Sequence, residues 1–87
     1  MFKIFLSNDA SAFLHSLKKS SPTLHREVLA AIGYLQISPA VGEPLHDKLS
    51  GFLKLRLGTV RVVYRLDKNN RKIWIRKIDW RKTVYDL

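Results

Sequence analysis

Residues 50–66, Ser-Gly-Phe-Leu-Lys-Leu-Arg-Leu-Gly-Thr-Val-Arg-Val-Val-Tyr-Arg-Leu, carry the clearest structural pattern in the chain. Apolar and polar positions alternate on both sides of Gly58. Because successive side chains of a β-strand point to opposite faces, the alternation predicts a β-hairpin with one apolar and one cationic face. The cationic face would carry Lys54, Arg56, Arg61 and Arg65. Tyr64 alternates with the aliphatic residues and is therefore expected in the core.

The part of the chain before the hairpin predicts one strand and two helices. Residues 2–6 are an apolar run typical of a short strand. Ser7 offers an N-cap for a helix whose apolar residues recur at helical spacing as far as Lys19, a residue type that suits a helix C-terminus. Since proline fits the first position of a helix, Pro22 predicts the start of a second helix, which ends before Pro39. Both helices are amphipathic and need an apolar surface to cover.

The remaining segments complete the predicted fold. Residues 39–50 are rich in proline, glycine and polar residues and indicate a loop, and residues 67–71 indicate a polar turn. A further strand is predicted over residues 72–78, followed by a short extended or turn-like tail at the sheet edge. In that strand the side chains expected on the cationic side are those of Lys72, Trp74 and Arg76. The order β-α-α-β-β-β predicts an α+β fold, with two helices packed on a mainly antiparallel sheet.

Length and composition limit the class of protein. The chain has 87 residues, no cysteine and a net charge of +9. This length fits one domain with a single core, so we expect one domain over residues 1–87. Without cysteine no disulfide or thiolate metal site can form, and no stretch approaches the roughly 18 apolar residues of a membrane span. We therefore expect a soluble cytoplasmic protein with no membrane partner.

The positive charge is concentrated in the second half of the chain. Eleven of the sixteen lysines and arginines lie between residues 52 and 82, together with only two of the seven acids, so this region holds the whole excess. A one-sided field of this kind favours a polyanionic partner, with nucleic acid first and an acidic protein second. A solvated sheet face that keeps a small protein soluble is the plainer alternative.

Three blocks of residues resemble those of a known family. They are Pro39…Gly42…Leu45…Leu49-Ser-Gly, Lys54-Leu-Arg56…Gly58…Arg61-Val-Val-Tyr64 and Arg81-Lys-Thr-Val-Tyr85. With the helix pair they resemble the RelE/ParE superfamily of bacterial toxins from type II toxin–antitoxin modules, over almost the whole chain. The resemblance implies a RelE-like fold and a toxin whose partner is a cognate acidic antitoxin. It also implies that the toxin–antitoxin complex binds operator DNA.

The resemblance implies an activity and a site as well. RelE-like toxins cleave messenger RNA in the A site of the ribosome, which would make this chain an endoribonuclease (an mRNA interferase). Carried over position by position, the catalytic residues are Lys54, Arg61, Arg81 and Tyr85. The residues expected to contact RNA around them are Arg56, Arg65, Trp74, Arg76 and Trp80. The two tryptophans could instead complete the core or an antitoxin interface, and Tyr85 could instead anchor the tail.

The residues themselves favour catalysis by charge stabilisation. His15, His25 and His46 all lie before the cationic hairpin, so a paired-histidine nuclease is disfavoured. Asp67 and Asp79 are separated by a strand and have no acidic neighbour, which disfavours a two-metal nuclease. No metal and no cofactor is expected. Guanidinium groups can hold a phosphate through two parallel hydrogen bonds and offset its developing charge.

Two departures from the family pattern keep other functions open. Many relatives carry a histidine or another cation just before the arginine of the last motif, where this chain has Asp79 and Trp80. Some RelE-like enzymes also carry a second lysine where this chain has Phe52. One alternative is a ParE-like toxin, which shares the scaffold and poisons DNA gyrase without nuclease activity. A degenerate, non-toxic homologue that only binds its partners is another.

Overall fold

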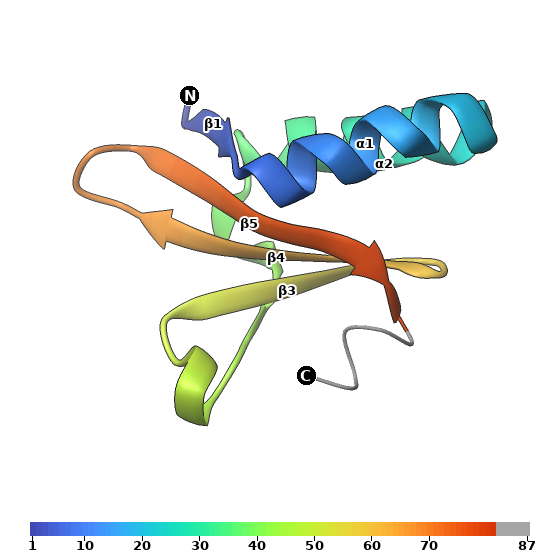
Figure 1. Ribbon diagram of the computed structural model, residues 1–87. Coiled ribbons are helices and arrows are strands. Elements are labelled where there is room, and N and C mark those ends of the chain that lie inside the picture. The colour runs from blue at the N-terminus through green and yellow to red at the C-terminus, as the bar shows by residue number, and fades with distance from the viewer. Residues whose placement is uncertain (82–87) are drawn as a thin grey trace.

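The structure, a computed structural model, describes residues 1–81 of the chain. Its two helices cover one face of a five-stranded sheet (Figure 1). The elements are β1 (Lys3–Leu6), α1 (Asn8–Ser20), α2 (Pro22–Leu35), η1 (Pro39–Val41), β2 (Glu43–Pro44), η2 (Asp47–Leu49), β3 (Phe52–Leu57), β4 (Val60–Asp67) and β5 (Lys72–Trp80). The predicted α+β class, with two helices on a mainly antiparallel sheet, is confirmed. Neither helix is long and apolar enough to cross a membrane.

The strand order across the sheet is β1-β5-β4-β3-β2. β1, the first strand of the chain, lies parallel to β5, and the other neighbouring strands are antiparallel. Two details differ from the sequence prediction. The region 39–50 contains the short strand β2 and two 3-10 turns, because Glu43 and Pro44 pair with β3. Residues 79–80, predicted in the tail, belong to β5 because they pair with β4.

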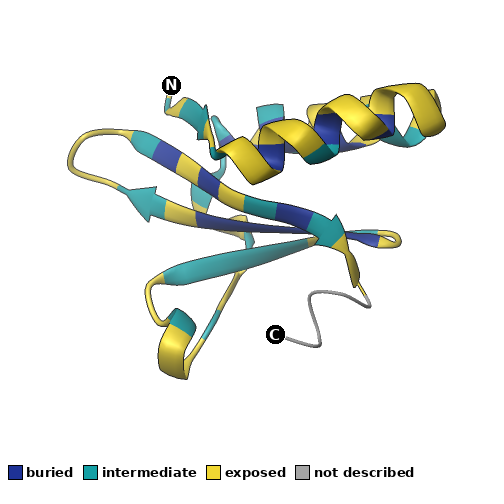
Figure 2. Ribbon diagram, in the orientation of Figure 1, coloured by how far each residue is buried: buried dark blue, intermediate teal, exposed yellow. Residues whose placement is uncertain are grey.

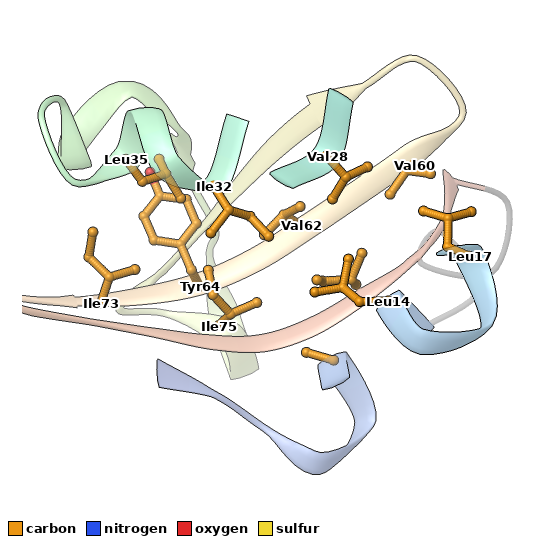
Figure 3. Close-up of a cluster of buried hydrophobic side chains, with 12 residues drawn as sticks. Leu14, Leu17, Val28, Ile32, Leu35, Val60, Val62, Tyr64, Ile73 and Ile75 are labelled. Carbon is orange, nitrogen blue, oxygen red and sulfur yellow. The ribbon is translucent and has the colours of Figure 1, made fainter. Parts of the chain in front are cut away.

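The core lies between the helices and the sheet, and Figure 3 shows its side chains. The helices contribute residues at spacings of three and four, so each helix buries a single face. In the central strand β4, residues 60–64 are buried on both faces of the sheet (Figure 2). The larger buried side chains are Leu14, Leu17, Val28, Ile32, Leu35, Val60, Val62, Tyr64, Ile73, Ile75 and Ile78. Burying a side chain of this size stabilises the fold by about 1.5–3 kcal/mol. Tyr64 is in the core, as predicted.

The hydroxyl of Tyr64 fastens the loop that precedes β2. It donates a hydrogen bond to the carbonyl oxygen of Pro39 (2.7 Å) and accepts one from the N–H of Gly42 (3.0 Å). Burial raises the pKa of this hydroxyl above its ordinary value, while the Gly42 hydrogen bond acts in the opposite direction. Gly42 has no room for a side chain, since a Cβ there would lie 2.6 Å from the Tyr64 hydroxyl oxygen. The fixed loop places Glu43 opposite Lys54 in the sheet.

Candidate functional site

The sheet face that points away from the helices carries the predicted cationic residues. Strand pairing arranges the side chains of this face in rows that run across the strands. The row nearest the β3–β4 turn holds Arg56, Arg61 and Asp79. The next row holds Glu43, Lys54, Val63 and Lys77. Successive rows are two residues apart along each strand, or about 7 Å.

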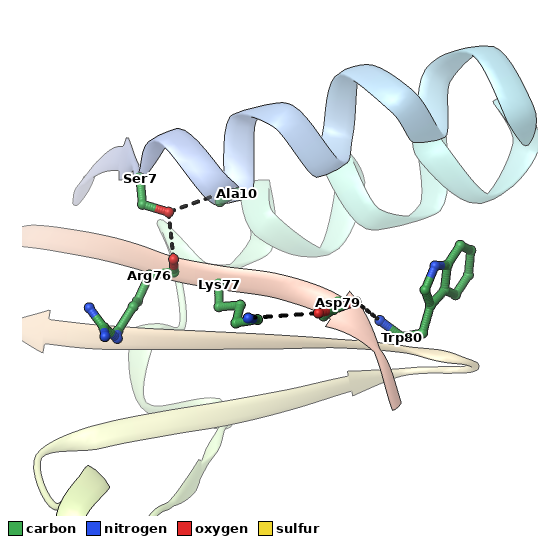
Figure 4. Close-up of polar contacts among 6 residues, drawn as sticks. All are labelled: Ser7, Ala10, Arg76, Lys77, Asp79 and Trp80. Carbon is green, nitrogen blue, oxygen red and sulfur yellow. Dashed lines mark hydrogen bonds and ion pairs between the residues drawn. The ribbon is translucent and has the colours of Figure 1, made fainter. Parts of the chain in front are cut away.

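A β-bulge in β5 sets the direction of several side chains. Tyr64 pairs with Ile75, but Val63 pairs with Lys77, so Arg76 is an extra residue in β5. A bulge places its extra residue beside the next one and shifts the alternation that follows. Arg76 consequently lies with Lys77 on the cationic face, pointing away from α1 (Figure 4). Beyond the bulge Ile78 returns to the core.

Four cationic side chains from three strands line one small cavity. Its volume is about 110 Å³, and its cationic lining residues are Lys54, Arg61, Arg76 and Lys77. Leu45, Leu49 and Val63 form the apolar part of the wall. Arg61 is only 3% exposed. Because part of the wall is apolar and Arg61 is buried, an anion in this cavity would interact with the cations more strongly than an anion on an open surface.

Two carboxylates lie beside the cavity lysines. Glu43 Oε2 is 3.8 Å from Lys54 Nζ, and Asp79 Oδ2 is 3.8 Å from Lys77 Nζ (Figure 4). The Glu43 side chain is 71% exposed, so its ion pair with Lys54 is open to exchange with a bound anion. Asp79 also accepts a hydrogen bond from the N–H of Trp80 at 2.7 Å, which fixes its position.

The structure brings together some of the predicted site residues. Lys54, Arg61 and Arg76 line the cavity, and Arg56 is exposed beside Arg61 in the same row. Arg65 and Trp74 face each other in the next row of the cationic face. The backbone N–H of Arg81 donates to the carbonyl oxygen of Thr59 (2.8 Å), which places Arg81 beside the β3–β4 turn with an exposed side chain. Tyr85 lies outside the described residues.

Trp80 does not join the cationic face. Its ring packs edge-on against Phe13 of α1, with the ring centroids 5.3 Å apart. Figure 4 shows the Trp80 ring on the side of β5 that faces α1. Strict alternation along β5 would put Trp74 and Trp80 on one face, but the bulge between them reverses it. Trp80 therefore lies on the helix side of the sheet, away from the cations with which it was grouped, and its predicted contact with RNA stays a prediction.

Sequence reasoning also missed two residues of this site. Lys77 was not placed on the cationic face, because strict alternation from Arg76 points it into the core. The spacing of three between Ile75 and Ile78 was the available signal, since both are buried although alternation separates them. Glu43 was missed because only the pairing of β2 with β3 brings it to Lys54. No local pattern in the loop indicates that pairing.

A two-helix, five-stranded architecture of this kind is that of toxins from bacterial toxin–antitoxin modules. The crystal structure of the toxin–antitoxin complex RelBE2 from Mycobacterium tuberculosis contains a chain that is 32% identical to this one. The two agree with a TM-score of 0.80 over 92% of this chain and 98% of that chain. The YoeB/ParE toxin from Agrobacterium tumefaciens is 15% identical and shares the fold, with a TM-score of 0.81 over 91% of this chain and 98% of its own.

The sequence comparison supports the same class. Toxin RelG of Mycobacterium tuberculosis is 32% identical, over 84% of this chain and 91% of its own length. A comparison with models of known protein families gives no match. The chain belongs to the RelE/ParE superfamily of toxins from toxin–antitoxin modules.

Proposed function

We propose that this toxin is a metal-independent endoribonuclease that cuts messenger RNA on the ribosome and is neutralised by a cognate antitoxin. The observation that supports this proposal best is the cavity in which Lys54, Arg61, Arg76 and Lys77 converge. Charge stabilisation of a phosphate requires several donors fixed around one point, and a cavity partly walled by apolar side chains makes such donors more effective.

The proposed reaction needs no group beyond side chains and the RNA itself. The 2′-oxygen of a ribose attacks the adjacent phosphorus, a new bond forms between them, and the bond from phosphorus to the 5′-oxygen of the next nucleotide breaks. The proton of the 2′-hydroxyl passes to a base, and the departing 5′-oxygen receives a proton from an acid. Negative charge grows on the phosphate oxygens between these steps, and this charge is what the cations oppose.

The side chains take different parts in this proposal. Arg61 presents a planar guanidinium held in place by burial, which suits a phosphate that must be gripped in one orientation. Lys54 and Lys77, in the neighbouring row of the same face, supply point charges to the cavity. The family resemblance implies that Arg81 and Tyr85 are catalytic as well, and we propose that Arg81 contacts a phosphate and that Tyr85 acts on the 2′-hydroxyl or stacks on a base.

The ion pairs of the site support the proposed dependence on the ribosome. Lys54 and Lys77 each have a carboxylate 3.8 Å away, so RNA must displace or rearrange these pairs before it gains the full charge of the lysines. A ribosome that holds the substrate in place would supply the positioning that the small cavity does not. Weak cleavage of free RNA by the isolated toxin is therefore expected.

The two proposed partners, RNA and an acidic antitoxin, are negatively charged, which suits the positive charge of the chain. A net charge of +9, whose whole excess lies between residues 52 and 82, suits an acidic antitoxin that covers the cationic face as well as it suits RNA. Solved relatives occur in complexes such as RelBE2 from Mycobacterium tuberculosis and YoeB–YefM from Staphylococcus aureus. We extend to this toxin an antitoxin partner and, for the complex, binding to operator DNA.

The test is a map of RNA ends after induction. Wild-type toxin and the Arg61→Lys variant are expressed separately, and 5′ ends are mapped by primer extension on an abundant transcript. The wild type should produce new ends confined to translated codons, and Arg61→Lys should produce far fewer because lysine lacks the bidentate fork. Lys18→Ala, which removes an exposed cation from the helix side of the molecule, is the matched control and should cut like the wild type.

Two results would contradict the proposal. Growth arrest without new RNA ends would indicate a target other than messenger RNA, such as gyrase. Equal cutting by the wild type and a folded Arg61→Lys variant would remove Arg61 from the site. Circular dichroism of the purified variants is needed in both cases, because Arg61 is buried and its replacement also perturbs packing.

A further inference from the structure

A row of aromatic residues crosses the cationic face next to the cavity. Phe5 pairs with Trp74, Trp74 pairs with Arg65, and Arg65 pairs with Phe52, so one row spans four strands. The rings of Phe5 and Trp74 are stacked, with centroids 4.6 Å apart and planes inclined by 23°. Trp74 is nevertheless 44% exposed. The indole of Trp74 is stacked on Phe5 and is partly exposed to solvent, so it offers a rigid flat surface.

Cations surround this aromatic row. Lys72 Nζ lies 5.7 Å from the ring centre of Phe5 and 5.9 Å from that of Trp74. The guanidinium of Arg76 lies 5.9 Å from the ring centre of Phe52. Contacts of this kind hold a cation at an aromatic face while leaving its other side available to an anion. A cleft of about 1020 Å³ opens over the row, lined among others by Phe52, Arg65, Trp74 and Arg76.

Arg76 connects the cleft to the cavity of Lys54, Arg61 and Lys77. It lines both, and the aromatic row is adjacent to the row of Lys54 and Lys77, about 7 Å away along the strands. A ligand with a phosphate in the cavity could therefore extend a planar group over Trp74 without leaving the sheet. A nucleotide has this composition, whereas the carboxylate side chains of an acidic peptide have no ring to place on the indole.

We propose that the row of Phe5, Trp74, Arg65 and Phe52 binds an unpaired base of single-stranded RNA, next to the nucleotide whose phosphate enters the cavity. This inference rests on the proposed function and adds to it the place of a neighbouring base. Binding is by stacking, which every base can provide, with Arg65 and Arg76 on the adjoining phosphate. The site therefore selects single strands over duplexes without selecting one codon.

The test uses the fluorescence of Trp74 in the full chain. Trp80→Phe, at the ring that packs on Phe13, serves as the background so that Trp74 is the sole tryptophan. This protein is titrated with a short 2′-O-methyl RNA of mixed sequence, which cannot be cleaved, and with the same backbone lacking its bases. The RNA should quench the fluorescence of Trp74. In a separate titration with a labelled oligonucleotide, the Trp74→Ala substitution should weaken binding of the RNA by about 5- to 150-fold. Binding of the abasic backbone should be the same with and without Trp74.

Controls keep each outcome decisive. Trp74→Phe retains an aromatic ring and should restore much of the affinity, while Tyr34→Ala removes an exposed aromatic from α2 and should leave binding unchanged. The inference is overturned if the RNA does not quench Trp74, if Trp74→Ala weakens abasic and base-containing RNA equally, or if only an acidic peptide requires the indole. A toxin that passes this test yet produces no RNA ends on ribosomes would contradict the proposed cleavage alone.

Discussion

The hydroxyl of Ser7 donates a hydrogen bond to the carbonyl oxygen of Arg76, the extra residue of the β5 bulge (Figure 4). The same oxygen of Ser7 accepts a hydrogen bond from the N–H of Ala10 (3.0 Å) and caps α1. One side chain thus joins the start of a helix to the irregularity that places Arg76 and Lys77 on the cationic face. The geometry of the cavity is tied to the packing of α1 through this residue.

Ser7→Ala should lower the free energy of unfolding by about 1–2 kcal/mol, because it removes the helix cap and the bond to the bulge together. Urea denaturation measures the change. Ser16→Ala is the matched control, since Ser16 is exposed in the same helix, and it should change stability by less than about 0.5 kcal/mol. Equal stability of the two variants would show that the Ser7 contacts contribute nothing.

Two glycine-to-alanine substitutions should change stability in opposite directions. At Gly42 a Cβ would lie 2.6 Å from the Tyr64 hydroxyl oxygen and 2.8 Å from the Lys54 carbonyl oxygen. Gly42→Ala should therefore lower the free energy of unfolding by about 1–3 kcal/mol. At Gly33, in α2, a Cβ meets nothing within 4 Å, and alanine should stabilise the helix by about 0.5–1 kcal/mol. Thermal denaturation of the two variants tests the pair, and a neutral Gly42→Ala would refute the close approach to Tyr64.

Alkaline pH should destabilise the fold through Tyr64. Its pKa is raised in the folded state by burial, so the folded protein favours the protonated hydroxyl. This contribution to stability is fully present below the ordinary tyrosine pKa of about 10 and is lost as the pH rises through the higher, folded value. Urea denaturation at a series of pH values should show that the free energy of unfolding declines above about pH 10, and that it declines less in Tyr64→Phe.

A separate cost is expected for Tyr64→Phe at neutral pH. The substitution leaves the Pro39 carbonyl and the Gly42 N–H without their partner, which should destabilise the protein by about 1–3 kcal/mol. Tyr34, which is 53% exposed, is the control residue. A Tyr34→Phe variant with the same alkaline profile as Tyr64→Phe would contradict the assignment to the buried hydroxyl.

Lys77 should matter for cleavage although alternation alone places it in the core. Lys77→Ala removes one cation from the cavity, so the cleavage rate in purified ribosome complexes should fall on the order of 100-fold, as for loss of a single charge-stabilising donor. Asp79→Asn removes the carboxylate beside Lys77 and leaves every cation of the cavity in place, so it should not lower the cleavage rate in this way. Wild-type cleavage by Lys77→Ala would exclude this lysine from the site.

The sequence predicts those parts of the fold that depend on local patterns. The alternation around Gly58 correctly placed Lys54, Arg56, Arg61 and Arg65 on one face, because a hairpin with a two-residue turn has its register set by the turn itself. The helices were predictable for a similar reason, since caps and apolar spacing are local. The family resemblance added the class of protein, which residue patterns alone left open.

Other features depend on contacts between distant segments. The bulge at Arg76 is stabilised by Ser7, 69 positions earlier, and no pattern within β5 reveals that bond. The short strand β2 exists because Tyr64 holds the loop before it, a contact across more than twenty residues. These are the features that complete the cavity, which explains why Lys77 and Glu43 were missed while the hairpin cations were found.

The pairing of β1 with β5 has a consequence for how the protein is made. β1 leaves the ribosome first, yet the strand it pairs with is the last of the sheet to be synthesised. Contacts between sequence-distant strands form late because the intervening chain must be ordered first. A nascent chain therefore carries an incomplete sheet until β5 has been synthesised. If the proposed function holds, a nascent toxin is unable to attack a ribosome before β5 has left the exit tunnel and completed the sheet.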